Sequence, residues 1–145
     1  MNTLRASKYP GVPGTIAAAV ISLAVFASPA FADEIKVSLS GDAEVPAVKT
    51  QAKGSGTVMI NADMTVSGSV TTTGVAGTMA HIHQAAAGAN GPVIVPLAKS
   101  GDATWTVPAG AKLTEAQYKA YKAGELYINV HSAENKGGEV RGQLK

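Results

Sequence analysis

Cysteine is absent from this 145-residue chain. Its absence excludes disulfide bonds, thiolate metal ligands and catalysis by a thiol. The chain also has no glycine-rich phosphate or dinucleotide loop, no nucleophile elbow and no repeat of fixed period. Any chemistry must therefore come from other side chains, and we expect no catalytic residue of these classes.

An excess of charge is also missing once the N-terminal segment is set aside. Two of the twelve Lys and Arg residues lie before residue 33, whereas all ten Asp and Glu residues lie after it. The remainder is therefore neutral when its histidines are neutral. Such a balance offers no basic patch to nucleic acid or anionic lipid, so we expect neither as a partner.

The one long apolar run lies near the N-terminus. Arg5 and Lys8 precede a mostly apolar stretch over 15–26, and Ala30-Phe31-Ala32 has the small-x-small pattern of a signal peptidase site. A membrane anchor is the alternative interpretation. The run is shorter than the roughly 20 residues that cross a bilayer, which favours a cleaved leader.

We therefore expect a signal peptide over 1–32, cleaved before Asp33, and a secreted or periplasmic protein. Residues 33–145 are then a single domain, large enough to bury a core without disulfides. No membrane span is expected after the leader is removed.

Short alternating runs of apolar and polar residues follow the leader, with turn residues between them. This pattern is typical of strands half-buried in an antiparallel sheet. One helix is predicted over 114–123, because Thr114 and Gln117 have the spacing of a capping box and Gly124 suits a helix end. The composition predicts an all-β, antiparallel Greek-key sandwich or barrel with one short helix. The expected strands are 34–40, 56–60, 64–72, 79–83, 92–97, 104–107, 126–132 and 139–144.

All three histidines fall in two of these strands. His81 and His83 share one face of their strand, opposite to Ile82, and His131 shares a face with Asn129. Two residues on one strand face lie about 7 Å apart, a spacing that suits two ligands of one ion. If the two strands meet, three imidazoles converge at the surface of the β-core.

A set of three imidazoles suits copper(II) or zinc(II). Met79 lies two residues before His81 and shares its face, and its thioether would favour copper(I). A methionine in such a position is more often a packing residue than a ligand. The histidines themselves can be structural, donating to backbone carbonyls and anchoring the neighbouring loops.

Three further polar residues are candidates for supporting the histidines. Glu44 can orient a ring through its N–H, as carboxylates beside metal ligands do, or it can be an ordinary loop carboxylate. Asn129 can support the site or anchor a loop. Glu139 can support the site, or it can form an ion pair with Arg141 on an exposed strand, which contributes only about 0–1 kcal/mol.

Five stretches of the predicted domain carry a pattern: 41–46, 80–83, 90–93, 123–132 and 137–144. Together and in this order they resemble the CHRD domain, the module named after chordin. Two departures, Gln84 where glycine is common and Lys136 where proline is common, both fall in predicted loops. The resemblance implies an immunoglobulin-like or dismutase-like β-sandwich. In chordin such domains belong to an extracellular protein that restrains growth factors, and for exported bacterial members no settled activity is implied.

The His81-x-His83 strand also resembles the copper-binding strand of copper–zinc superoxide dismutase, another Greek-key protein. That enzyme needs six histidines and an aspartate, so three histidines exclude its two-metal centre, and any copper here would be mononuclear. We predict an exported binding protein that holds copper or zinc through His81, His83 and His131. The alternative is an extracellular protein-interaction module with structural histidines, and a mononuclear copper oxidoreductase is the third hypothesis.

Overall fold

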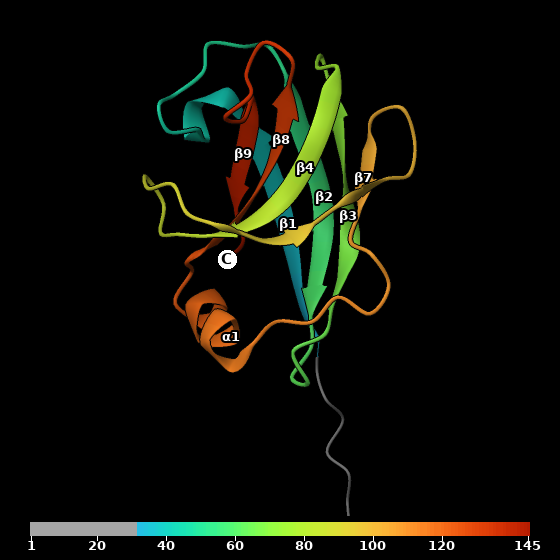
Figure 1. Ribbon diagram of the computed structural model, residues 1–145, viewed down its shortest axis with the longest axis vertical. Helices are drawn as coiled ribbons and strands as arrows, with labels where there is room; N and C mark the ends of the chain where they lie inside the picture. Colours follow the sequence, from blue (N-terminus) through green and yellow to red (C-terminus); the bar gives the residue numbers. More distant parts are fainter. Residues whose placement is uncertain (1–31) are drawn as a thin grey trace, which may run out of the picture.

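The computed structural model describes residues 32–145 (Figure 1), so the predicted leader, Ala32 excepted, lies outside the described residues. The described part contains nine β-strands, one α-helix and one 3-10 turn. All predicted strands and the predicted helix are present. Their bounds are β1 Asp33–Ser40, η1 Gly41–Ala43, β2 Lys53–Ile60, β3 Val66–Thr73, β4 Gly77–Gln84, β5 Val93–Pro96, β6 Ala98–Lys99, β7 Thr104–Thr106, α1 Glu115–Lys122, β8 Leu126–Ser132 and β9 Val140–Gln143.

The nine strands form one continuous sheet in the order β5-β4-β8-β9-β1-β2-β3-β7-β6, and every strand pair is antiparallel. The segment 93–99 connects the two ends of this sheet: Pro96 pairs with His81 on β4, and Ala98 pairs with Thr106 on β7. The sheet therefore curls into two facing layers (Figure 1). The predicted all-β antiparallel fold with one short helix is confirmed, with both layers supplied by a single sheet.

The core follows the predicted alternation. On β1, Ile35, Val37 and Leu39 are buried while the residues between them are exposed. The facing layer contributes Ile82 from β4 and Ile128 from β8, so the apolar faces of both layers meet in one cluster. Burial of such side chains is the main stabilising contribution to a domain of this size.

β8 departs from this pattern because all seven of its residues are buried. Leu126, Ile128 and Val130 face the core. Tyr127, Asn129 and His131 lie on the outer face, and the loops 85–92 and 133–139 flank β8 and cover them. The outer face of β8 is thus a polar layer that is shielded from solvent.

The helix and one hairpin show how local sequence sets the element ends. Thr114 accepts a hydrogen bond from the Gln117 amide, and the Gln117 side chain accepts from the Thr114 amide, which confirms the capping box. The strand expected to begin at Met64 begins at Val66 instead. Met64 has a left-handed backbone (φ 71°) and belongs to the turn, where Asp63 accepts hydrogen bonds from the amide and the hydroxyl of Thr65.

Within residues 32–145, no helix has the length and apolar character needed to span a membrane.

Candidate metal centre

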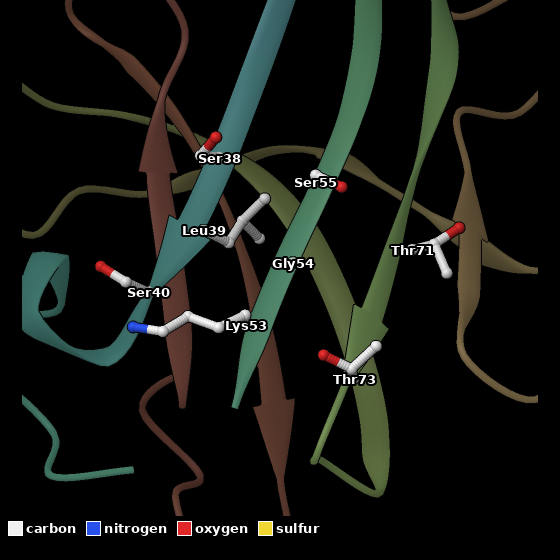
Figure 2. Close-up of a pocket in the computed structure, with 8 residues that line it drawn as sticks. All are labelled: Ser38, Leu39, Ser40, Lys53, Gly54, Ser55, Thr71 and Thr73. Atoms are coloured by element: carbon white, nitrogen blue, oxygen red, sulfur yellow. The ribbon is translucent and has the colours of Figure 1, made fainter. Parts of the chain in front are cut away.

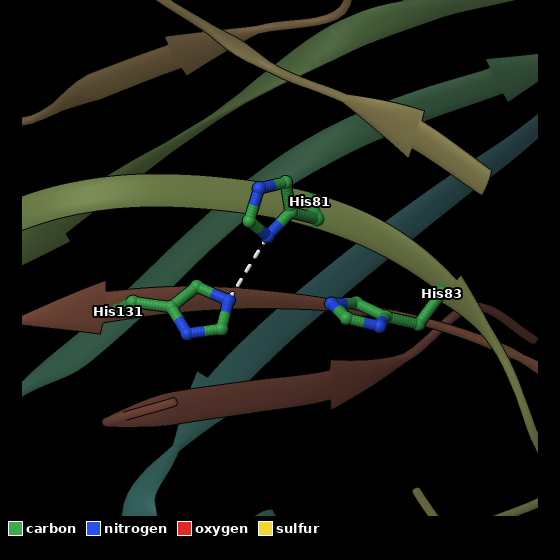
Figure 3. A group of neighbouring side chains, drawn as sticks. All are labelled: His81, His83 and His131. Carbon is green, nitrogen blue, oxygen red and sulfur yellow. Dashed lines mark hydrogen bonds between the residues drawn. The ribbon is translucent and has the colours of Figure 1, made fainter. Parts of the chain in front are cut away.

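The pairing of β4 with β8 brings the histidines together. His81 pairs with Asn129, Met79 pairs with His131, and His83 pairs with Tyr127, all in one antiparallel register. Because side chains alternate along each strand, all six side chains of these three pairs share the outer face. Figure 3 shows His81 and His83 on β4 with the ring of His131 reaching toward them from β8.

One ring nitrogen from each histidine lies within 4.8 Å of the other two. Nδ1 of His81 and Nε2 of His131 are 3.0 Å apart, the hydrogen bond drawn in Figure 3. Two imidazoles on one ion, each with a metal–nitrogen bond of about 2.0–2.1 Å, have nitrogens at most about 4.2 Å apart. Around a tetrahedral ion the nitrogens lie about 3.4 Å apart. A single ion can therefore join all three rings after the widest pair closes by up to about 1.4 Å, or by about 0.6 Å where that pair lies on opposite sides of the ion.

Backbone carbonyls set the tautomers of two of the rings. Nδ1 of His83 donates to the carbonyl oxygen of Gly91 at 2.9 Å, and Nδ1 of His131 donates to that of Lys136, also at 2.9 Å. Since a carbonyl only accepts, both Nδ1 atoms carry the proton and neither Nε2 atom does. This is the arrangement in which a protein histidine binds a metal through Nε2. The Nε2 lone pair of His131 accepts the hydrogen bond from Nδ1–H of His81, whereas that of His83 has no partner among the described residues.

The cluster lies on the outer face, as predicted, but the loops cover it more deeply than the sequence indicated. His83 and His131 are only 8% and 6% exposed, whereas His81 is partly exposed. Burial, followed by repulsion from His131, lowers the pKa of His81. Burial likewise lowers the pKa of His83, against the raising effect of its bond to Gly91. Both rings are held neutral, as a metal ligand must be.

A buried stack lies behind His83. Its ring is parallel to that of Tyr127, with centroids 4.8 Å apart and planes 3° apart. Arg141 places its guanidinium carbon 3.4 Å from the centroid of the Tyr127 ring and is only 1% exposed. The sequence indicated that Tyr127 shares a face with His131 but gave no sign of this stack, because the contact depends on the lateral pairing of β8 with β9.

Glu44 and Asn129 form a second buried pair, beside the histidines. Glu44 is 6% exposed, and burial raises its pKa to about 7 against the opposing effects of Arg141 and Asn129. Oε1 of Glu44 and Oδ1 of Asn129 have no hydrogen-bond partner among the described residues. Loop carbonyls, rather than Glu44, accept the Nδ1 protons of His83 and His131. Asn129 donates a hydrogen bond to the carbonyl of Gly137, as a loop anchor does.

The other two candidates lie outside this arrangement. Glu139 accepts a hydrogen bond from the Thr50 hydroxyl at 2.7 Å, and within the part of the chain described it forms no ion pair with Arg141. Hydrogen bonding by Ser132 lowers the pKa of Glu139. Met79 is 50% exposed at the rim of the cluster, so its thioether is available to solvent.

The surface has two hollows lined by polar residues. One, of about 290 Å³, is bordered by Glu44, Pro46 and Lys136, next to the loop that covers His131. The other, of about 380 Å³, lies on the outer face of β1, β2 and β3 among Ser38, Ser55 and Thr71 (Figure 2). Hydroxyls and the ammonium of Lys53 line the second hollow, and no metal-ligating or nucleophilic cluster accompanies them there.

These features define a class: a curled antiparallel β-domain with a loop-covered cluster of three histidines on its outer face. The CHRD domain family model matches residues 35–144. The chain therefore belongs to the CHRD domain family, and the resemblance seen in the sequence is confirmed. No curated protein and no solved structure matches the chain significantly.

Proposed function

We propose that this CHRD domain is a binding module that holds one copper or zinc ion through His81, His83 and His131. The observation that carries the proposal is the unpaired Nε2 of His83. This atom is buried, has no hydrogen-bond partner among the described residues, and lies beside the ring nitrogens of the other two histidines. A buried polar atom without a partner costs about 1–3 kcal/mol, and a bound ion would remove that cost.

The ligand set supports copper or zinc over harder cations. Three neutral imidazoles supply nitrogen donors only, which suit these two metals, whereas magnesium and calcium prefer oxygen ligands. Met79 at the rim offers a soft fourth donor that would favour copper(I). The proposed role is binding rather than catalysis.

A structural role for the histidines is the competing proposal, and one observation favours it. His83 and His131 each donate a hydrogen bond to a backbone carbonyl of a loop that covers them, so these rings stabilise the fold even without metal. Under this proposal the domain is an extracellular protein-interaction module. The two proposals differ in whether the unprotonated nitrogens bind an ion.

Calorimetric titration with copper(II) and with zinc(II) distinguishes them. One site per chain is expected, weakened at least about tenfold by His81→Ala, His83→Ala or His131→Ala. Gln84→Ala, one residue beyond His83 on β4, is the matched control and should bind normally. Folded wild-type protein that binds neither metal would overturn the metal proposal and leave the structural one.

We further propose that the domain acts outside the cytoplasm. The support is the leader pattern, with its basic start, apolar stretch and Ala30-Phe31-Ala32 site. N-terminal sequencing of the protein from its natural host should begin at or near Asp33. Native protein that still begins at Met1 in the cytoplasm would contradict this.

A further inference from the structure

The support behind His83 constrains the ring in two independent ways. The hydrogen bond from Nδ1 to the Gly91 carbonyl sets the tautomer, while the parallel stack on Tyr127 sets the plane of the ring. The same tyrosine also fixes the carbonyl, because its hydroxyl accepts a hydrogen bond from the Gly91 amide at 3.3 Å. Tyr127 thus contacts His83 directly through its ring and indirectly through Gly91.

Arg141 completes this support from the other side. Its guanidinium covers the Tyr127 ring and donates to the Asn90 side chain and to the Ala86 carbonyl, both at 3.3 Å. Both acceptors belong to the loop that carries Gly91. A planar guanidinium suits stacking and forked donation together, which an ammonium does not, so Arg141 joins β9 to both the tyrosine and the loop.

Without this support, the orientation of His83 would be unfavourable. Its Nε2 is buried and unpaired, so rotation or a change of tautomer that found a partner would lower the energy of the metal-free ring. The stack and the Gly91 bond hold the ring against that relaxation. Orienting groups of this kind commonly change metal affinity by about 10–100-fold.

We propose that Tyr127 and Arg141 are positioning residues that hold His83 in the Nδ1–H form, with Nε2 aimed at the ion. The proposal rests on the metal-binding function for the role of His83 as a ligand. The orientation of the ring in metal-free protein does not depend on that function, so the two can be tested separately.

The first measurement uses metal-free, ¹⁵N-labelled protein. Long-range ¹H–¹⁵N spectra of the histidine rings should show His83 protonated at Nδ1 alone. In Tyr127→Leu, which removes the stack, His83 should become a mixture of tautomers. Tyr127→Phe keeps the ring and should retain more of the native form, and Tyr118→Leu on α1 is the control for loss of a phenol ring elsewhere.

The second measurement is zinc(II) titration of the same proteins. Affinity should fall about 10–100-fold in Tyr127→Leu and less in Tyr127→Phe. Arg141→Lys, which keeps the charge but loses the planar fork, should also weaken binding. Lys99→Met is its control, since Lys99 lies over the Trp105 ring in a separate cation–aromatic contact.

The outcomes separate the two proposals. A folded Tyr127→Leu protein with an unchanged His83 tautomer and unchanged zinc affinity overturns the positioning role. If Tyr127→Leu fails to fold, unchanged spectra and affinity in both Tyr127→Phe and Arg141→Lys overturn it equally. A wild-type protein that binds neither zinc nor copper overturns the metal site, while a tautomer change in Tyr127→Leu would still establish the support of the ring.

Discussion

Gly138 closes the loop 133–139 over the buried pair of Glu44 and Asn129. Its backbone is left-handed (φ 129°), and a Cβ atom there would overlap Oε1 of Glu44 and lie 2.5 Å from Nδ2 of Asn129. Gly138→Ala should therefore lower the free energy of unfolding by about 1–3 kcal/mol, measured by urea denaturation. Gly137→Ala is the control, because nothing lies within 4 Å of its added Cβ. Equal stability of the two variants would contradict the close packing.

Glu44 gives a prediction about pH. Burial raises its pKa from 4.5 to about 7, so between these values the folded state keeps a proton that the unfolded state has released. Stability must then fall as pH rises through that window. Glu44→Gln has no carboxyl to titrate, so it removes this loss. Between pH 4.5 and pH 7.5 its free energy of unfolding should rise relative to that of the wild type by about 1–3 kcal/mol, after allowance for partial solvation.

The comparison should be made as a difference between the two proteins at each pH. His81 and His83, whose pKa values are lowered, make stability rise with pH, and this effect cancels in the difference. Arg141 is the charged group that faces Glu44 and is unchanged in both. Parallel pH profiles of the two proteins would contradict the raised pKa.

At the same scale, the sequence identified the three candidate histidines but not their surroundings. Alternation along β4 and β8 is a local property, so it placed His81, His83 and His131 on outer faces correctly. The carbonyls of Gly91 and Lys136 and the stack on Tyr127 arise from loops and lateral pairing, which alternation does not encode. Glu44 was offered either as a group that orients a ring or as an ordinary loop carboxylate, and for His83 and His131 the acceptors of the Nδ1 protons are loop carbonyls.

Among the elements, the loop 85–92 depends on Asn90. Its side chain donates to the Val45 carbonyl at 2.7 Å and accepts from Arg141 at 3.3 Å, which joins the loop to two other segments. Asn90→Ala should lower the free energy of unfolding by about 1–3 kcal/mol and speed hydrogen exchange at the Gly91 amide. The exposed Ala87→Ser, on the same loop, should change neither. Unaltered exchange in Asn90→Ala would show that the loop is held elsewhere.

Element boundaries were predicted well where local chemistry marks them. The capping box at Thr114 and the regular alternation of β1 each depend only on residues that are close together in the sequence. Met64 shows the limit: its apolar side chain fits the strand pattern, but the hydrogen bonds of Asp63 extend the turn through it.

For the whole molecule, the candidate site exists because of the order of the strands in the sheet. β4 and β8 are far apart in the sequence but adjacent in the sheet, and β9 beside them supplies Arg141. The sequence predicted an antiparallel sandwich but could not give this strand order, since pairing between distant strands depends on the packing of the complete core. The sequence therefore could not show that the two strands that carry the histidines pair with each other.

A ligand that binds the folded state alone must stabilise the whole domain. At a free zinc(II) concentration 100 times the dissociation constant, the free energy of unfolding should rise by about 2.7 kcal/mol, seen as a higher melting temperature that a chelator reverses. The His81→Ala/His83→Ala double variant should show no such rise. Because protons compete for the ligands, and the pKa values of His81 and His83 are lowered, the stabilisation should persist somewhat below pH 6.5 and vanish at lower pH. If wild type and double variant respond equally to zinc at pH 7, the ion binds elsewhere, and the histidines serve the fold by fastening its loops.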